Sequence, residues 1–160
     1  MSDEEAEDVT FQEYAKLYLD RETRKGMVGE LQAHDGDTVV FTEWRFEHAF
    51  FTSRHKTTRQ YNKGKFDRDR ACRIRWIGWL IKGTISSVEY CHIPDRNRRD
   101  PSGRIMVKRL YVLWEERYLI WLEPRFTGGW WFSSAYVESR GWNYIRKLIR
   151  GCVRKKVSRD

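Results

Sequence analysis

The chain has 160 residues, of which 40% are hydrophobic and 15% aromatic, so it can bury the core of a single domain. Its formal net charge is +8, and no apolar run approaches the roughly 20 residues that span a bilayer. The three cysteines, Cys72, Cys91 and Cys152, are odd in number and widely spaced, which argues against a disulfide scaffold. The acidic N-terminus lacks the apolar segment of a secretion signal, so we expect a cytoplasmic protein.

The first part of the chain is predicted to be mainly helical. Residues 1–9 are acidic and are expected to be disordered, and Thr10 can cap a helix over about 11–22. The stretch "HDGDTVVFT" predicts a turn and a short strand that ends near Thr42, which then caps the short helix "EWRFEHAFF". The polar, basic segment 52–65 is expected to be mobile.

The clearest helical pattern covers residues 67–82, with Gly83 just past its end. Ala71, Ile74, Ile77 and Ile81 share one face of this helix, and the other faces carry Arg68, Arg70, Arg73 and Arg75.

Four strands are predicted after this helix, followed by a basic amphipathic helix beginning at "GWNYIRKLIRG". The strands cover about 84–92, 104–113, 117–123 and 130–138, and the loop "PDRNRRDPSG" separates the first two. The predicted fold class is α+β, with N-terminal helices packed on a four-stranded antiparallel meander. One domain would span residues 10–151, between the acidic segment 1–9 and a basic tail at 152–160.

The charge distribution favours a nucleic-acid partner. The C-terminal segment 146–159 carries seven basic side chains, and clustered Lys and Arg release counterions from phosphates. The basic residues are Arg146, Lys147, Arg150, Arg154, Lys155, Lys156 and Arg159.

The sequence contains no recognisable metal or nucleotide motif. His34, His48, His55, His92 and the cysteines show neither C-x-x-C nor H-E-x-x-H spacing, and "TGGW" is a hairpin turn without the Lys of a phosphate-binding loop. We therefore expect neither a metal nor a cofactor. RNA cleavage by its own 2′-hydroxyl needs only a base, an acid and groups that stabilise the phosphorane, and these are present.

The segment "EPRFTGGWWFSSAYV" concentrates polar groups in a predicted hairpin. Strand alternation puts Trp130, Phe132, Ser134 and Tyr136 on one face, and Trp131, Ser133, Ala135 and Val137 on the other. The set with Ala and Val is expected to face the helices, which favours Ser134 and Tyr136 over Ser133 for the open face. The alternatives are that His48 is a half-buried structural imidazole and that Arg125 is a surface residue paired with Glu123.

Three segments in order resemble the phage-associated branch of the barnase–EndoU–colicin–RelE-like nuclease superfamily. They are "VVFTEWRFEHAFF", "KFDRDRACRIRWIGWLI" and "LYVLWEERYLIWLEPRFTGGWWFSSAYV", and the resemblance covers about residues 36–138. It implies a four-stranded antiparallel sheet and metal-independent cleavage of RNA to a 2′,3′-cyclic phosphate. It also implies a toxin or mobile-element effector whose partners are RNA and an antitoxin or immunity protein.

The resemblance assigns the catalytic positions to His48, Arg73, Arg125, Ser134 and Tyr136. We expect His48 to be the general base or acid, the two arginines to hold the phosphate, and Tyr136 to be a second acid candidate. The expected substrate-binding residues are Arg70, Ser133, Trp130, Trp131, His55, Lys65, Lys147 and Arg150.

The sequence is also compatible with two other functions. A non-catalytic nucleic-acid-binding or protein-interaction module would use the same basic faces without a poised imidazole. An inhibitor that mimics nucleic acid with its acidic N-terminus is disfavoured by the basic remainder of the chain.

Overall fold

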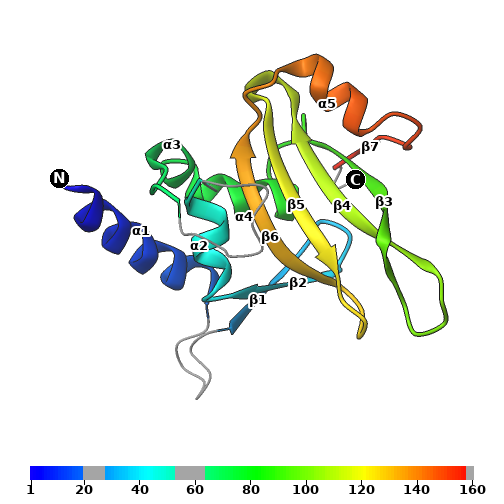
Figure 1. Ribbon diagram of the computed structural model, residues 1–160, viewed down its shortest axis with the longest axis horizontal. Helices are drawn as coiled ribbons and strands as arrows, with labels where there is room; N and C mark the ends of the chain where they lie inside the picture. Colours follow the sequence, from blue (N-terminus) through cyan, green and yellow to red (C-terminus); the bar gives the residue numbers. More distant parts are fainter. Residues whose placement is uncertain (20–27, 53–63, 158–160) are drawn as a thin grey trace.

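The computed structural model describes residues 1–19, 28–52 and 64–157 (Figure 1). Its helices are α1 (Asp3–Tyr18), α2 (Arg45–Phe50), α3 (Arg68–Ala71), α4 (Ile74–Lys82), α5 (Trp142–Leu148) and the 3-10 turn η1 (Trp114–Glu116). Its strands are β1 (Val28–Gln32), β2 (Thr38–Thr42), β3 (Glu89–Arg99), β4 (Ile105–Leu113), β5 (Tyr118–Pro124), β6 (Trp130–Val137) and β7 (Lys155–Lys156). Within these ranges, no helix is both long and apolar enough to cross a membrane.

The strands form one mixed sheet of seven, in the order β1-β2-β6-β5-β4-β3-β7. The pair β2–β6 is parallel, and the other neighbouring pairs are antiparallel. The predicted four-stranded antiparallel meander is therefore wrong. The strands β3 to β6 do pair in chain order, but β1, β2 and β7 extend the sheet at both edges. The two outermost strands show no hydrophobic alternation, because the one buried position of β1 is Gly29 and β7 consists of two exposed lysines.

Helix α1 begins much earlier than predicted, so residues 1–9 are not disordered. Ser2 and Glu5 form a reciprocal capping box, in which the Glu5 N–H donates to Ser2 Oγ (3.1 Å) and the Ser2 N–H donates to Glu5 Oε2 (2.7 Å). Carboxylates in the first turn also interact favourably with the helix dipole. The acidic composition that suggested disorder thus stabilises the start of a helix.

The other end of α1 is fixed against α4. The Tyr18 hydroxyl donates to the Ile74 carbonyl (2.6 Å) and accepts from the Gly78 N–H (3.0 Å). A Cβ at Gly78 would lie 3.3 Å from that hydroxyl, so a larger residue there would crowd the contact.

The predicted helix over 67–82 is interrupted between α3 and α4. Asp67 caps α3 by accepting from the N–H groups of Asp69 and Arg70. The Asp69 carbonyl then accepts from the Arg73 guanidinium (2.6 Å) and the Cys72 thiol (3.1 Å), whereas the Arg73 N–H bonds to Arg70. These side chains compete with the backbone bond that a continuous helix would make.

Two further boundaries differ from the prediction. Strand β3 starts at Glu89 and continues through residues 94–99 of the predicted loop, with a register shift against β4 between Asp95 and Arg99. The predicted basic tail is partly structured, because β7 pairs with β3 and Val157 is buried.

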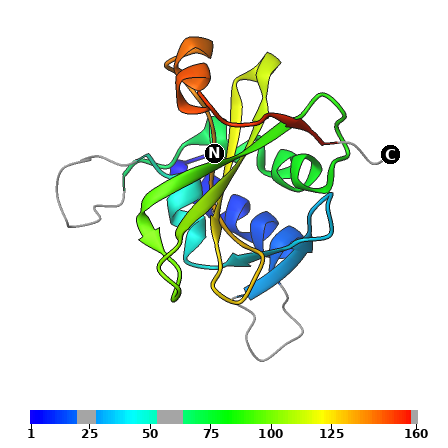
Figure 2. The ribbon, with the colours of Figure 1, turned by 90° about the vertical axis from the view of Figure 1, so that its right-hand side faces the viewer.

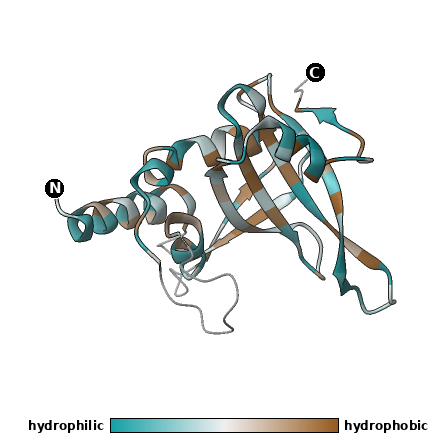
Figure 3. Cartoon of the chain, turned by 45° about the horizontal axis from the view of Figure 1, so that its top comes forward, coloured by the Kyte–Doolittle hydropathy of each residue, from teal (hydrophilic) through white to brown (hydrophobic). Residues whose placement is uncertain are grey.

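The sheet has a hydrophobic core on each face. Figures 2 and 3 show helices on both sides of the sheet. One core packs between the sheet and helices α1, α2 and α4 and includes Tyr14, Ile77 and Phe132. A smaller core, which includes Leu119 and Ile145, lies on the opposite face beneath α5. The part of this second face beyond α5 carries polar side chains.

Candidate active site

A shallow depression of about 250 Å³ lies on the sheet face that α5 only partly covers. Its lining comes from three adjacent strands and combines a cation, a carboxylate, three hydroxyl groups and an indole. The lining residues are Lys108 of β4, Trp121 and Glu123 of β5, and Ser133, Ser134 and Tyr136 of β6. Three of the predicted site residues therefore lie together.

A β-bulge in β6 brings both serines to this depression. Trp121 pairs with Ser134, but the next residue, Leu122, pairs with Phe132, so Ser133 is the extra residue. The bulge also corrects the predicted alternation. Trp130 and Phe132 belong to the helix-covered core with Ala135, whereas Ser134 and Tyr136 face the other side.

Glu123 is the most enclosed charged group of the depression, with a side chain that is 13% exposed. Its Oε2 contacts Arg45 Nη2 at 2.8 Å and Arg98 Nη2 at 3.3 Å, and its Oε1 accepts from Ser133 Oγ at 3.3 Å. A buried carboxylate is stable when such partners satisfy it. The expected alternative, a surface pair between Glu123 and Arg125, is not what the structure shows.

Positive charge exceeds negative charge around Glu123. Arg98 and Lys108 both reach Asp95 Oδ2, each at 3.6 Å. Three cations, with Arg45, therefore share two carboxylates. The side chains of Arg98 and Lys108 are 44% and 36% exposed, so a ligand can reach them. The surplus cation favours an anionic ligand.

Tyr136 supplies a hydroxyl that remains protonated near neutral pH. Burial raises the pKa of Tyr136, and the Trp121 Nε1–H, which donates to its oxygen at 3.0 Å, opposes that rise. The Arg70 guanidinium lies 5.1 Å from the Tyr136 ring centre and donates to the carbonyls of Ala49 and Phe51. Arg70 therefore ties α3 and α2 to this end of β6.

His48 lies on α2, the helix that also carries Arg45. The residue is exposed overall, and its ring meets the Trp44 ring edge-on at 6.0 Å. Partial burial and the charge of Arg45 lower the pKa of His48, and the charges of Glu123 and Glu47 oppose this effect. The imidazole is therefore mainly neutral at pH 7 and electrostatically coupled to Glu123.

Arg125 and Trp131 lie beside the depression, near the hairpin turn. The Arg125 guanidinium is 4.8 Å from the Trp131 ring centre, and Trp131 is the cross-strand partner of Glu123. Arg125 Nε is buried and has no partner among the described residues.

Several predicted site residues lie elsewhere. Arg73 contacts Asp69, Cys72 and the Trp76 ring, none of which lines the depression. Lys147 and Arg150 are exposed on and just after α5. Lys65 is exposed, and its carbonyl bonds to Thr52. His55 lies outside the described residues.

Trp130 is buried on the opposite face, in a second charged cluster around Arg109. Arg109 is only 3% exposed and contacts Asp35 Oδ2 at 2.7 Å and Asp37 Oδ2 at 3.2 Å. The His92 ring stacks on the Trp130 indole, and His92 Nε2 accepts from Arg109 Nε at 3.1 Å. This cluster joins the β1–β2 turn to β3 and β4, which indicates a structural role.

Sequence reasoning missed Arg45, Arg98 and Lys108. Lys108 could have been recognised in the sequence, because it is a charged residue on the face of β4 that otherwise carries the apolar Leu110 and Val112. Arg45 is separated from Glu123 by 78 residues, and no local pattern reveals such a pair.

In the described ranges, no group of three or more His, Cys, Asp or Glu side chains is arranged to hold a metal ion. Compared with family models, curated proteins and solved structures, the chain matches none. The functional proposal therefore depends on the geometry of the depression.

Proposed function

We propose that the protein is a metal-independent endoribonuclease that acts in the cytoplasm. The observation that carries the proposal is the depression itself, where surplus cations and uncharged hydroxyl donors adjoin on an open sheet face, and whose Glu123 is electrostatically coupled to the His48 imidazole of α2. The combination suits a scissile phosphate, whose charge increases in the phosphorane transition state. The resemblance to the nuclease superfamily is part of this proposal.

In the proposed reaction, neutral His48 removes the proton of a ribose 2′-hydroxyl, which attacks the adjacent phosphorus. Arg98 and Lys108 stabilise the charge that develops on the non-bridging oxygens, and Glu123 holds Arg45 and Arg98 in position. Tyr136 gives its proton to the departing 5′-oxygen, with the serines as further donors. The products are a 2′,3′-cyclic phosphate and a free 5′-hydroxyl.

The substrate-binding surface would extend beyond the depression. Trp131 and Arg125 can stack a base at one side, because aromatic and guanidinium planes both accept bases. Lys147 and Arg150 of the α5 region would contact phosphates farther along the strand. An antitoxin or immunity protein remains a proposed partner of the effector.

A direct test uses an end-labelled RNA of mixed sequence incubated with the purified protein in EDTA. We expect fragments with 2′,3′-cyclic phosphate ends, and no cleavage of the same sequence with 2′-O-methyl groups at every position. Cleavage that needs added Mg²⁺, or that persists on the 2′-O-methyl strand, would contradict the mechanism.

The second candidate is a non-catalytic RNA-binding module, favoured by the fact that Glu123 is already paired with two arginines. Such a module would bind both strands in the same experiment and leave both intact.

A further inference from the structure

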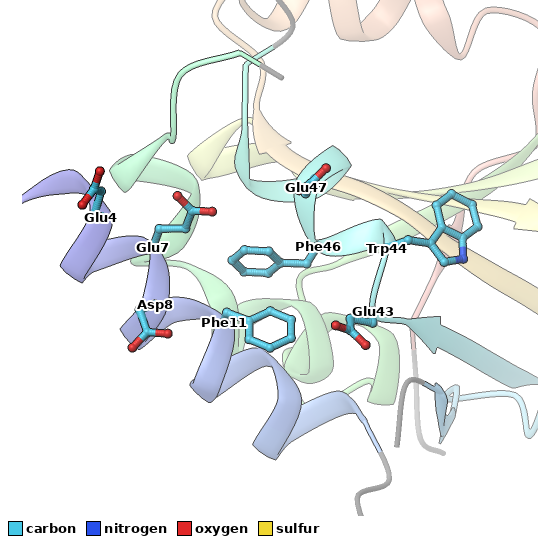
Figure 4. A pocket seen from close by; sticks show the side chains of 8 residues that line it. All are labelled: Glu4, Glu7, Asp8, Phe11, Glu43, Trp44, Phe46 and Glu47. Atoms are coloured by element: carbon cyan, nitrogen blue, oxygen red, sulfur yellow. The ribbon is translucent and has the colours of Figure 1, made fainter. Parts of the chain in front are cut away.

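A second hollow, of about 480 Å³, lies between α1 and α2 (Figure 4). Its aromatic residues are Phe11 of α1, Phe46 of α2 and Trp44, which directly precedes α2. The Phe11 and Phe46 rings meet edge-to-face at 5.1 Å, and Trp44 is 57% exposed. An exposed indole beside an apolar floor is typical of a protein-binding groove.

Carboxylates surround these aromatic groups, although the protein as a whole is strongly basic. The other residues of the lining are Glu4, Glu7, Asp8, Glu43 and Glu47. Figure 4 shows Glu4, Glu7 and Asp8 on α1, Glu47 on α2 and Glu43 just before α2, around Phe11 and Phe46. The lining contains no Lys, Arg or His, and Glu4, Asp8 and Glu43 form no ion pair with any other described residue.

The arginine of α2 is already paired with a carboxylate outside the groove. Arg45 is engaged in the ion pair with Glu123 of the other site, and its guanidinium lies 4.3 Å from the Trp44 ring centre. Because the described lining of the groove holds five carboxylates and no cation, it would repel RNA, and we do not assign it to the proposed substrate surface.

We propose that this groove binds a basic amphipathic helix of a partner protein. The partner would insert an apolar side chain against Phe11, Phe46 and Trp44, and its Lys or Arg side chains would meet the carboxylates on both sides. A groove between two helices suits a helical ligand, and charge complementarity selects a basic one. The proposal is independent of the ribonuclease function, although the ligand would contact the helix that carries His48.

The probe is a fluorescein-labelled 14-residue peptide with a helical Lys/Leu pattern, titrated with the full chain and followed by fluorescence anisotropy. Reversing three charges in Glu4→Lys/Asp8→Lys/Glu43→Lys should weaken binding by at least roughly 30-fold. The matched control, Glu30→Lys/Glu115→Lys/Glu116→Lys, changes the net charge equally on other exposed elements and should have a much smaller effect. Trp44→Ala should weaken binding about 10-fold, because it removes the exposed anchor.

Three further measurements make the proposal falsifiable. A peptide with Glu in place of Lys should not bind, and spermine should not compete at equal charge concentration, since it lacks an apolar face. Equal weakening by the two triple variants would show a general charge effect and overturn the proposal, as would equal competition by spermine. Self-association of the unmodified chain that the groove variant abolishes would identify a second copy as the occupant and also overturn it.

Discussion

The sheet carries two charged clusters on opposite faces, and their compositions are reversed. Around Arg109, a buried cation is held by two carboxylates, Asp35 and Asp37, with aromatic groups on either side. Around Glu123, a half-buried carboxylate is held by two cations, Arg45 and Arg98, while Arg98 and Lys108 both contact a second carboxylate, Asp95. Among the described residues, the first cluster has no excess of cations over carboxylates even when Lys155 near His92 is counted, whereas the second has one more cation than carboxylates.

This difference separates a structural cluster from a ligand site. Arg109 has its hydrogen-bond donors occupied by Asp35, Asp37, His92 and Tyr111, so a phosphate would have to displace these partners. The cations beside Glu123 are partly exposed and would gain by meeting an anion. The burial of the charged side chains and the number of their partners thus distinguish a structural cluster from a ligand-binding one, although both clusters contain the same residue types.

The largest effect should come from Arg109→Ala. Loss of this cation leaves Asp35 and Asp37 without their partner and opens the contact between the β1–β2 turn and β4. We expect the free energy of unfolding to fall by about 3–5 kcal/mol, measured by urea denaturation. Arg98→Ala, in the other cluster, should cost at most about 1 kcal/mol. Similar losses of unfolding free energy in the two variants would show that the two clusters do not differ in structural role.

Lys108→Ala should have the next largest effect, on catalysis rather than on stability. Its side chain is partly exposed, so the fold loses little, but one charge stabiliser of the phosphorane disappears. We expect kcat/KM for RNA cleavage to fall about 100-fold. Lys16→Ala, on the exposed surface of α1, is the matched control and should cleave normally. A Lys108 variant with normal cleavage would exclude the depression as the active site.

Tyr136→Phe should have a smaller effect, because it removes only the hydroxyl. The ring and its contact with Arg70 remain, so RNA affinity should be nearly unchanged while kcat falls about 10-fold. Tyr144→Phe removes a hydroxyl from α5 and is the control. If affinity rather than kcat fell, Tyr136 would be a binding residue and the proposed acid would have to be another group.

Part of this site was predictable from the sequence because strand alternation is a local property. It predicted that Ser134 and Tyr136 share the face opposite Ala135, which the core packing around Ala135 supports. It misplaced Trp130 and Phe132, because a bulge at Ser133 reverses the alternation and leaves no clear mark in the sequence.

The capping box of α1 can be recognised in the sequence, although we predicted disorder there. The ion pairs around Glu123 cannot be recognised in the sequence. Ser2 and Glu5 have the spacing that begins α1, but their acidic surroundings led to a prediction of disorder. Glu123 meets Arg45 and Arg98 only because α2 and β3 come together across the sheet, and sequence spacing carries no information on such contacts.

The smallest effects should be on the pH dependence of stability, through His92 of the Arg109 cluster, and on the pH dependence of cleavage, through His48 near Glu123. Burial and the charge of Arg109 lower the pKa of His92, so the folded state disfavours its protonation. The unfolded chain then binds more protons below the ordinary histidine pKa of about 6.5, and stability is retained above that pH and lost as the pH falls below it. His92→Gln should flatten this acid loss of stability, measured by urea denaturation between pH 5 and about 7.

The pKa of His48 is also lowered, so cleavage by its neutral form should decline only below about pH 6.5. His48→Ala should remove this acid limb from the residual cleavage, and the acid loss of stability that His92 contributes should remain. If His92→Gln abolished the acid limb of cleavage instead, the active site would lie at the Arg109 cluster.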